Sequence, residues 1–273
     1  MNRKALIEQI RKKSSYLCVG LDPDIHKIPK HLHHYDNPVL VFNQQIIEAT
    51  SDICVAYKPN VAFFEALGLD GLKTLNDTRK LIPEECFTIA DAKRGDIGNT
   101  ATMYAKAFLE QMDFDSITIA PYMGQDSIEP FLQFEEKWAI VLGLTSNKGN
   151  QDFQRKMVDG IPLYELVMKT AMHWGTDENM MFVVGATNEE DFEHIRTFCP
   201  DHFLLVPGVG AQGGDLEKLS QYGLNKDIGL LVNSTRGIIY ASNGKDFAEK
   251  AREEALAVNE QMESLINKYS PSV

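Results

Sequence analysis

Eight short apolar runs, rich in Val, Ile and Leu, recur along the chain and constrain its fold more than any other feature. Each run is nearly continuous in apolar residues, which is typical of strands buried on both faces of a parallel sheet. Helical patterns lie between the runs. This alternation predicts an α/β protein, a single (β/α)8 TIM barrel, with an open doubly wound sheet as the alternative. The runs are residues 16–21, 53–57, 86–90, 116–120, 139–144, 181–185, 202–206 and 229–232.

The helices expected between the strands show apolar stripes or capping signals. The sequence Thr187-x-x-Glu190 predicts a helix start, because a threonine followed three residues later by a glutamate forms a capping box. An extra N-terminal helix, about residues 2–12, precedes the first strand. Other helices are expected at residues 39–51, 99–112 and 162–174. The last helix carries the clearest stripe, made of Phe247, Ala251, Ala255, Val258, Met262 and Leu265.

The length of 273 residues suits one (β/α)8 barrel, and we expect residues 1–273 to form a single catalytic domain. No Gly-rich dinucleotide fingerprint follows the first run, which favours the barrel over the doubly wound sheet. Two connections are long, residues 23–38 and 146–161, and loops of that length are often functional.

Charge and cysteine content narrow the class of protein. The net charge of −12 and the lack of a basic cluster argue against binding to nucleic acid or to anionic membranes. No apolar run approaches the ~18 residues of a membrane-spanning helix, and the first residues lack a signal core, so we expect a cytoplasmic protein. The four cysteines are scattered without a C-x-x-C pair, which predicts buried free thiols.

Charged residues follow three consecutive apolar runs. Asp22 follows the first run, Lys58 the second, and Asp91 and Lys93 the third. Because the strands of such a barrel end at one mouth, these side chains should gather there. Asp91 and Lys93 are two residues apart and would point to the same side of an extended strand. With Asp96 they would form an alternating row of charges that stabilise one another; the alternative is a purely structural salt-bridge cluster.

Glycines and an arginine follow the last two runs. Glycines let backbone N–H groups approach an anion, and the guanidinium group suits bidentate contact with phosphate. The loops after the last two strands of barrel enzymes often bind phosphate, so we expect a phosphate site here. An ordinary glycine turn is the alternative. The residues concerned are Gly208, Gly210, Gly213, Gly214, Arg236 and Gly237.

The segment Asp91-Ala92-Lys93-Arg94-Gly95-Asp96-Ile97, with its D-x-K-x-x-D spacing, resembles the signature of the orotidine 5′-phosphate decarboxylase family. Further segments resemble the family in the same order along the chain, and the whole chain resembles its longer bacterial (type 2) subfamily. They are Gly20-Leu21-Asp22-Pro23, Tyr57-Lys58-Pro59-Asn60, Leu144-Thr145-Ser146-Asn147, Pro207-Gly208-Val209-Gly210-Ala211-Gln212-Gly213-Gly214 and Thr235-Arg236-Gly237.

The resemblance implies decarboxylation of orotidine 5′-phosphate to uridine 5′-phosphate (UMP), the last step of de novo UMP synthesis. Lys93 would protonate ring carbon 6 as carbon dioxide leaves, and Asp91 would lie against the substrate carboxylate. Lys58 would support that pair and, with Asp22, contact the ribose hydroxyls. The same resemblance implies that neither a metal nor an organic cofactor takes part.

The resemblance also implies substrate-binding roles at the other strand ends. Ser146 would bind the pyrimidine edge, although the adjacent Thr145 is an alternative. Gln212 and Arg236, with Gly237 beside the arginine, would hold the phosphate.

A homodimer with shared active sites is implied as well. Asp96 and Thr100 would reach from one subunit into the site of its partner. We therefore expect the partners of this chain to be orotidine 5′-phosphate, UMP and a second copy of itself.

Three other functions remain open on the sequence alone. A metal-dependent sugar-phosphate decarboxylase or aldolase would need an acidic ligand at the end of the second run, where Lys58 stands. A Schiff-base aldolase would need a neutral amine, whereas Lys93 is flanked by two aspartates that favour its charged form. A catalytically silent phosphate-binding barrel is the third alternative.

Overall fold

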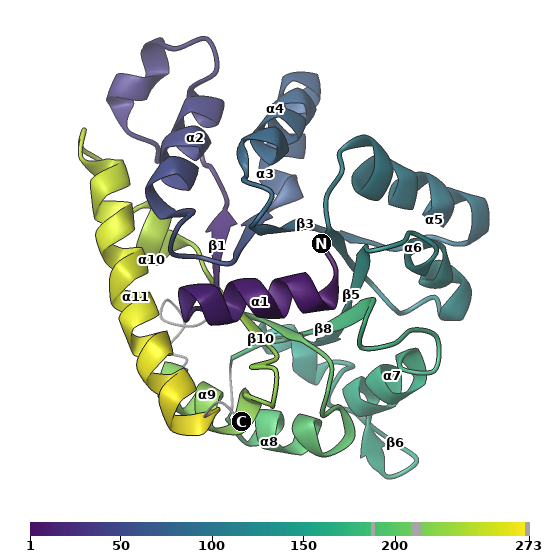
Figure 1. Ribbon diagram of the computed structural model, residues 1–273. Coiled ribbons are helices and arrows are strands. Elements are labelled where there is room, and N and C mark those ends of the chain that lie inside the picture. The colour runs from purple at the N-terminus through teal and green to yellow at the C-terminus, as the bar shows by residue number, and fades with distance from the viewer. Residues whose placement is uncertain (187–188, 209–214, 271–273) are drawn as a thin grey trace.

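The strands of this protein close into a barrel surrounded by helices, as Figure 1 shows for the computed structural model. The structure describes residues 1–186, 189–208 and 215–270. Within these residues the barrel has eight parallel strands in the order β1-β10-β9-β8-β5-β4-β3-β2, which confirms the predicted (β/α)8 fold. The strands are β1 (Leu17–Leu21), β2 (Ala56–Pro59), β3 (Phe87–Arg94), β4 (Ser116–Ile119), β5 (Trp138–Leu144), β8 (Met180–Val184), β9 (Leu204–Pro207) and β10 (Leu230–Ser234).

The bounds of the strands differ from those of the predicted runs, most of all in β2 and β3. The run at residues 53–57 begins too early, because Ile53 and Cys54 donate their backbone N–H groups to the carbonyl of Thr50 and so lie in the turn that follows the preceding helix. They are apolar because they are buried, not because they are extended. Strand β3 runs on to Arg94, past the predicted end at residue 90. Asp91, Lys93 and Arg94 therefore lie within the strand instead of after it, whereas Asp96 follows it.

The helices surround the barrel (Figure 1). The helix predicted at residues 99–112 changes from α to π geometry at Lys106 and ends at Gln111. Thr187 of the predicted capping box lies outside the described residues. The helices are α2 (Pro38–Thr50), α3 (Val61–Glu65), α4 (Gly68–Leu81), α5 (Gly98–Ala105) with its π extension (Lys106–Gln111), α6 (Glu129–Leu132), α7 (Leu163–Ala171), α8 (Glu189–Phe198), α9 (Leu216–Gly223), α10 (Arg236–Ile239) and α11 (Phe247–Tyr269), and 3-10 turns occupy Lys30–His34, Gln125–Ser127 and Lys148–Gln151.

The apolar stripe predicted for the last helix is confirmed in α11. Phe247, Ala251 and Ala255 are fully buried, and Met262 continues the same face. A helix with one apolar face gains most of its stability from packing that face, so α11 is held against the barrel by this stripe.

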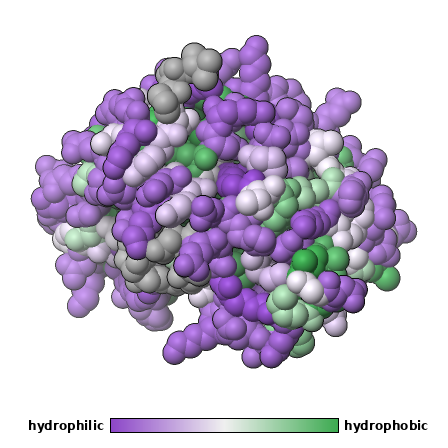
Figure 2. All heavy atoms as spheres, turned by 90° about the horizontal axis from the view of Figure 1, so that it is seen from below, coloured by the Kyte–Doolittle hydropathy of each residue, from purple (hydrophilic) through white to green (hydrophobic). Residues whose placement is uncertain are grey.

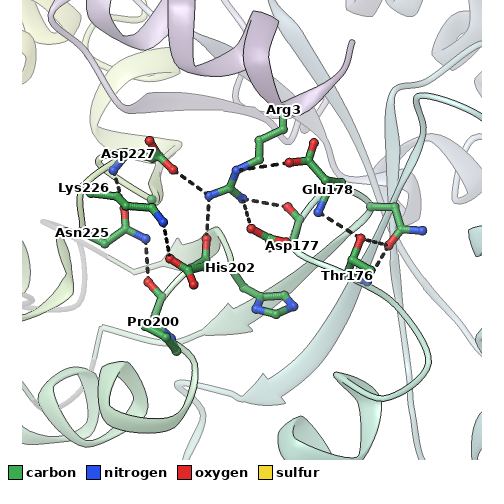
Figure 3. A network of polar contacts seen from close by, with 12 residues as sticks. Arg3, Thr176, Asp177, Glu178, Pro200, His202, Asn225, Lys226 and Asp227 are labelled. Atoms are coloured by element: carbon green, nitrogen blue, oxygen red, sulfur yellow. Dashed lines mark hydrogen bonds and ion pairs between the residues drawn. The ribbon is translucent and has the colours of Figure 1, made fainter.

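The predicted N-terminal helix is α1 (Arg3–Lys13), which lies across one end of the barrel (Figure 1). Arg3 is buried, and its guanidinium group donates to the carbonyls of Asp177 and Asp201 at 2.7 and 2.8 Å. It also pairs with the Asp227 carboxylate at 3.0 Å, as Figure 3 shows. These three residues directly precede β8, β9 and β10. Helix α1 therefore covers the amino ends of the strands, opposite to the end at which the strands finish.

The long connection at residues 146–161 contains an element that the sequence analysis missed. Strands β6 (Met157–Val158) and β7 (Ile161–Pro162) pair in antiparallel fashion around Asp159 and Gly160, which both have positive φ angles. An Asp-Gly dipeptide between two extended pairs is a strong hairpin signal, because both residues tolerate the left-handed conformation of a tight turn. The hairpin thus had a local signal in the sequence.

The surface and the cysteines agree with the composition. Hydrophilic side chains predominate on the face shown in Figure 2, and hydrophobic ones gather mainly toward one side of it. In the described part of the chain, no helix is both long and apolar enough to cross a membrane. Cys18, Cys54, Cys86 and Cys199 are buried and free, as predicted.

Candidate active site

The charged residues near the ends of β2 and β3 meet at the carboxyl end of the barrel. Lys58, on β2, places its ammonium nitrogen 2.8 Å from one carboxylate oxygen of Asp91 on β3. Lys93 places its own ammonium nitrogen 2.5 Å from the other oxygen of that carboxylate. The structure thus brings together three members of the predicted row. One carboxylate lies between two lysines, and both of its oxygens are paired.

Burial decides how these charges behave. Burial by itself would raise the pKa of Asp91, but Lys58 and Lys93 outweigh it and hold that pKa well below its ordinary value. Burial alone would likewise lower the pKa of Lys58, whereas the carboxylates of Asp91 and Asp22 bring it above the ordinary value. Asp91 and Lys58 therefore form a buried ion pair. Such a pair is costly to assemble, so its place at the mouth favours a functional role over a structural one.

Asp91 and Lys93 converge through a bulge, which differs from the regular strand that the spacing suggested. Ala90 pairs with Ile117 and Arg94 with Ile119, so three residues of β3 face a single residue of β4. Lys93 has a φ angle of 47°, in the left-handed region that side chains disfavour. The bulge turns both charged side chains toward the mouth although the strand is irregular, and bulges often have this effect next to active sites.

Asp22 lies beside this group, directly after β1. One of its carboxylate oxygens is buried and has no hydrogen-bond partner among the described residues. Burial raises the pKa of Asp22, an effect that Lys58 opposes. The side chain of Asn60 acts in the same direction as Lys58 and lowers the pKa of Asp22. The sequence analysis gave Asn60 no role, although its place directly after β2 is the same signal that singled out Lys58.

Asp96 does not join the row within its own chain. Its carboxylate accepts a hydrogen bond from the N–H of Ile97 at 2.8 Å, and in the described residues no contact links it to Lys93. Thr100 is exposed on α5. Ile97 and Met103, also near this turn, are 51% and 54% exposed. Among the described residues, the fourth charge that the sequence predicted is thus not paired with the other three, and exposed apolar side chains lie near it in the chain.

The loop after β5 shows which of two adjacent hydroxyls is free. The N–H and hydroxyl of Thr145 bind the side-chain amide of Gln154 at 2.7 and 2.8 Å, and its carbonyl accepts from the Asn150 amide at 2.8 Å. The hydroxyl of Ser146 has no hydrogen-bond partner among the described residues. Gly185, after β8, packs so closely that a Cβ atom there would lie 2.6 Å from the Ser146 nitrogen. Ser146 is therefore held in place with its hydroxyl unused.

The structure describes only part of the region after β9 and β10 where the sequence predicts a phosphate site. Gly208, at the end of β9, has a φ angle of 97°, which only glycine adopts readily. Arg236 and Gly237 are exposed at the start of α10, and no carboxylate of the described residues pairs with this guanidinium group. Gln212, with Gly210, Gly213 and Gly214, lies outside the described residues.

The first strand packs directly against the segment that leads to Arg236. A Cβ atom on Gly20 would lie 1.9 Å from the hydroxyl oxygen of Thr235, so only glycine fits there. Tyr240 donates its hydroxyl to the carbonyl of Asp22 and accepts from the N–H of Asp24, both at 2.8 Å. These contacts fix Arg236 relative to Asp22 across the β1–β10 seam.

In the parts of the chain that the structure describes, no three His, Cys, Asp or Glu residues gather as a possible metal site.

Comparison with known proteins places the chain in a family. The model of the orotidine 5′-phosphate decarboxylase / HUMPS family matches residues 15–251. The orotidine 5′-phosphate decarboxylase of Flavobacterium johnsoniae is 57% identical over 270 residues, which cover 98% of this chain and 99% of that protein. The Bacteroides fragilis (strain YCH46) protein of the same name is 54% identical over 267 residues, covering 96% and 97%.

Solved structures agree. The putative orotidine-monophosphate-decarboxylase of Toxoplasma gondii superposes with a TM-score of 0.86 at 36% identity, covering 97% of each chain. The Leishmania donovani OMP decarboxylase superposes with a TM-score of 0.83 at 33% identity, covering 97% of this chain and 98% of that one. The similarity spans the barrel and every charged segment described above, and this protein therefore belongs to the orotidine 5′-phosphate decarboxylase / HUMPS family, as its sequence motifs predicted.

Proposed function

We propose that this protein decarboxylates orotidine 5′-phosphate to UMP and carbon dioxide, the last step of de novo UMP synthesis, and that residues 1–273 act as one catalytic domain in the cytoplasm. The observation that carries the proposal is the Lys58–Asp91–Lys93 cluster at the open end of the barrel. Full-length relatives named orotidine 5′-phosphate decarboxylase support it.

The chemistry follows from the charges of the cluster. When the carboxylate leaves, negative charge develops on ring carbon 6, and a fixed ammonium group aimed at that carbon stabilises the charge as it forms. We assign this role and the protonation of carbon 6 to Lys93. Asp91 would face the departing carboxylate, and two like charges at ~4 Å repel by about 4 kcal/mol at an effective dielectric of ~20. The repulsion is relieved as neutral carbon dioxide forms, but we rank it below the contribution of Lys93.

Binding groups lie at the remaining strand ends. The buried, unpartnered oxygen of Asp22 suits a ribose hydroxyl, which would supply the missing hydrogen bond. Lys58, beside it, would share that contact. We assign the pyrimidine edge to Ser146, because every polar group of the adjacent Thr145 is already bonded within its loop.

The phosphate would be bound far from the scissile bond. Arg236 has no carboxylate partner in the described residues, and we assign it to the phosphate together with Gln212 and Gly237. Binding energy gained at this remote group can orient the ring and close loops over it, so that the phosphate contributes to the rate as well as to affinity.

We further propose a homodimer in which Asp96 and Thr100 complete the partner's site. Asp96 makes no contact with Lys93 of its own chain among the described residues, and Ile97 beside it is exposed. Burial of such apolar side chains against a second copy would explain their exposure here.

One experiment separates this function from its rivals. The purified protein is mixed with orotidine 5′-phosphate in the presence of EDTA, and the loss of substrate absorbance is followed. We expect complete conversion to UMP. Activity that disappears in EDTA and returns with magnesium would instead support the metal-dependent sugar-phosphate enzymes, and saturable binding without turnover would support a silent phosphate-binding barrel.

A further inference from the structure

A threonine on β4 contacts both residues of the proposed chemistry. Thr118 is buried, and its hydroxyl oxygen accepts a hydrogen bond from the backbone N–H of Lys93 at 2.9 Å. The same hydroxyl donates to the carboxylate of Asp91 at 3.1 Å. The direction of both bonds is fixed, because a backbone N–H can only donate and an ionised carboxylate can only accept.

The position of Thr118 explains why the bulge holds its shape. Thr118 is the single residue of β4 that faces the three bulged residues Asp91, Ala92 and Lys93. A bulge removes backbone groups from the sheet ladder, and a buried N–H left without a partner is costly. The Thr118 hydroxyl supplies that partner for Lys93, whose left-handed backbone would otherwise have little to favour it. Beyond the bulge the ladder resumes, with the N–H of Ala120 bonded to the carbonyl of Arg94 at 2.7 Å.

The second bond of Thr118 completes the environment of the carboxylate. One carboxylate oxygen of Asp91 accepts a hydrogen bond from Lys58, and the other accepts from Lys93 and Thr118. Donors from β2, β3 and β4 thus fix the plane of this carboxylate. With either lysine alone the carboxylate could rotate, because a lysine ammonium has no preferred direction about its axis.

We infer that Thr118 is a positioning residue for the decarboxylation. It holds the Lys93 backbone and the Asp91 carboxylate in fixed positions relative to each other and does not touch the substrate itself. The inference rests on the proposed function. It goes beyond it by assigning a role to a strand whose residues carry none of the charges of the site.

The test replaces Thr118 with valine, which has the same shape but no hydroxyl, and with serine, which keeps the hydroxyl. For Thr118→Val we expect kcat to fall by about tenfold to a hundredfold, the loss typical of a hydrogen bond to a charged group. KM for orotidine 5′-phosphate and the Kd of UMP should stay within about threefold of wild type, since ground-state contacts are intact. Thr118→Ser should retain most of the kcat.

The chain offers a matched control at the opposite end of the barrel. Thr88, on β3, is also buried, donates its hydroxyl to the Asp115 carboxylate at 2.7 Å and accepts from the Asp115 N–H at 2.8 Å. Thr88→Val removes the same pair of bonds far from the mouth. It should lower the Tm as Thr118→Val does and leave kcat unchanged.

The outcomes are distinct. Provided that wild type is active, any one of three results would show that Thr118 is structural only and would overturn the inference. The kcat of Thr118→Val could stay within about threefold of wild type, it could fall no further than the kcat of Thr88→Val, or Thr118→Ser could lose as much kcat as Thr118→Val. If the valine variant does not fold, Thr118→Ala carries the same kcat prediction. A wild-type protein without turnover would instead overturn the proposed function, and the role of Thr118 with it.

Discussion

Lys93 reaches from a strained backbone into an open part of the barrel mouth. Its side chain is 51% exposed although its ammonium group contacts a carboxylate that is only 9% exposed. A buried acid holding the tip of a half-exposed lysine leaves one side of the ammonium group open to a ligand. That arrangement suits a residue that must both stabilise charge and deliver a proton.

The variant Lys93→Ala tests this role. We expect kcat to fall by more than about a thousandfold, because the change removes both the proton source and the charge that faces the developing carbanion. Steady-state turnover measures the loss, and a thermal melt shows whether the fold is kept. Lys106→Ala, at an exposed position on the π extension of α5, is the control and should be fully active. Turnover of Lys93→Ala within tenfold of that control would contradict the assignment.

We expect Arg236 to act in phosphate binding and not at the bond that breaks. Arg236→Ala should weaken the binding of UMP by about tenfold to a hundredfold, as expected for the loss of a charge-assisted contact. The affinity for uridine, which has no phosphate, should be almost unaffected. Calorimetric titration with the two ligands gives the comparison, with Lys245→Ala as an exposed neighbouring control. Equal losses for nucleotide and nucleoside would show that Arg236 does not bind the phosphate.

At the scale of elements, α1 closes the amino end of the barrel while the site occupies the other end. Arg3 ties α1 to the segments before β8, β9 and β10, and its guanidinium group lies over the ring of Phe203 at 5.2 Å. Phe203 in turn packs edge to face with Trp138 at the start of β5. Stability and chemistry are therefore separated along the barrel axis, as is usual for this fold.

Arg3→Ala should be a stability variant. The variant leaves the carbonyls of Asp177 and Asp201 and the half-buried Asp227 carboxylate without the Arg3 guanidinium group, and we expect the free energy of unfolding to fall by ~3 kcal/mol. Denaturant unfolding measures this loss, and KM at a temperature where the variant is folded should match wild type. Arg11→Ala, exposed on the same helix, is the control. A change in KM without a loss of stability would contradict the separation of the two ends.

His202, at the same end of the barrel, should make the stability of the protein depend on pH. Burial lowers the pKa of His202; Arg3 and Arg196 act in the same direction, and Asp177 and Asp201 oppose them. Neither ring nitrogen has a hydrogen-bond partner in the described part of the chain, and the ring packs against Phe182 (Figure 3 shows His202 beside Arg3). The unfolded chain therefore binds a proton more readily than the folded protein does.

The sign of the effect follows by linkage. The contribution of neutral His202 to stability is complete above the unfolded pKa of about 6.5 and is lost as the pH falls below it. Unfolding curves at falling pH should show a smaller loss of stability in His202→Phe than in wild type. His173→Phe, at an exposed position, should behave like wild type. Identical pH profiles for all three proteins would rule out His202 as the source.

At the scale of the whole molecule, the mouth of the barrel borders an exposed apolar surface. Ile97, Met103 and Met123 are all 45% exposed or more, and Gly95 brings Met123 to the turn that carries Asp96. The charge predicted to complete the row thus lies at the edge of a surface suited to a second copy of the chain.

Mixing two variants tests whether subunits share sites. Asp96→Asn and Lys93→Ala should each be nearly inactive as homodimers. After subunit exchange, a mixed dimer contains one site with both wild-type residues, so activity should reappear at up to about half the wild-type level per mixed dimer. Native mass spectrometry confirms exchange. Confirmed exchange without any return of activity would place Asp96 in the site of its own subunit.

Local sequence patterns predicted much of the fold and of the candidate site. The eight apolar runs predicted a parallel sheet covered by helices on both faces, and the absence of a Gly-rich dinucleotide fingerprint after the first run favoured the closed barrel over the doubly wound sheet. The residues after the runs located Lys58, Asp91 and Lys93 correctly, since parallel strands of a closed barrel all end at one mouth. These features depend on periodicity and on chain direction, which a sequence carries directly.

Other features depend on contacts between distant segments. The pairing of Thr118 with Lys93 and the close approach of Gly185 to Ser146 involve residues 25 and 39 positions apart. Neither has a local signal, because both depend on strand register, and the first also depends on a bulge that breaks the regular alternation of side chains. Sequence therefore determined which groups reach the mouth, whereas the tertiary structure decided which of them touch, because register and bulging are set by packing across the whole barrel.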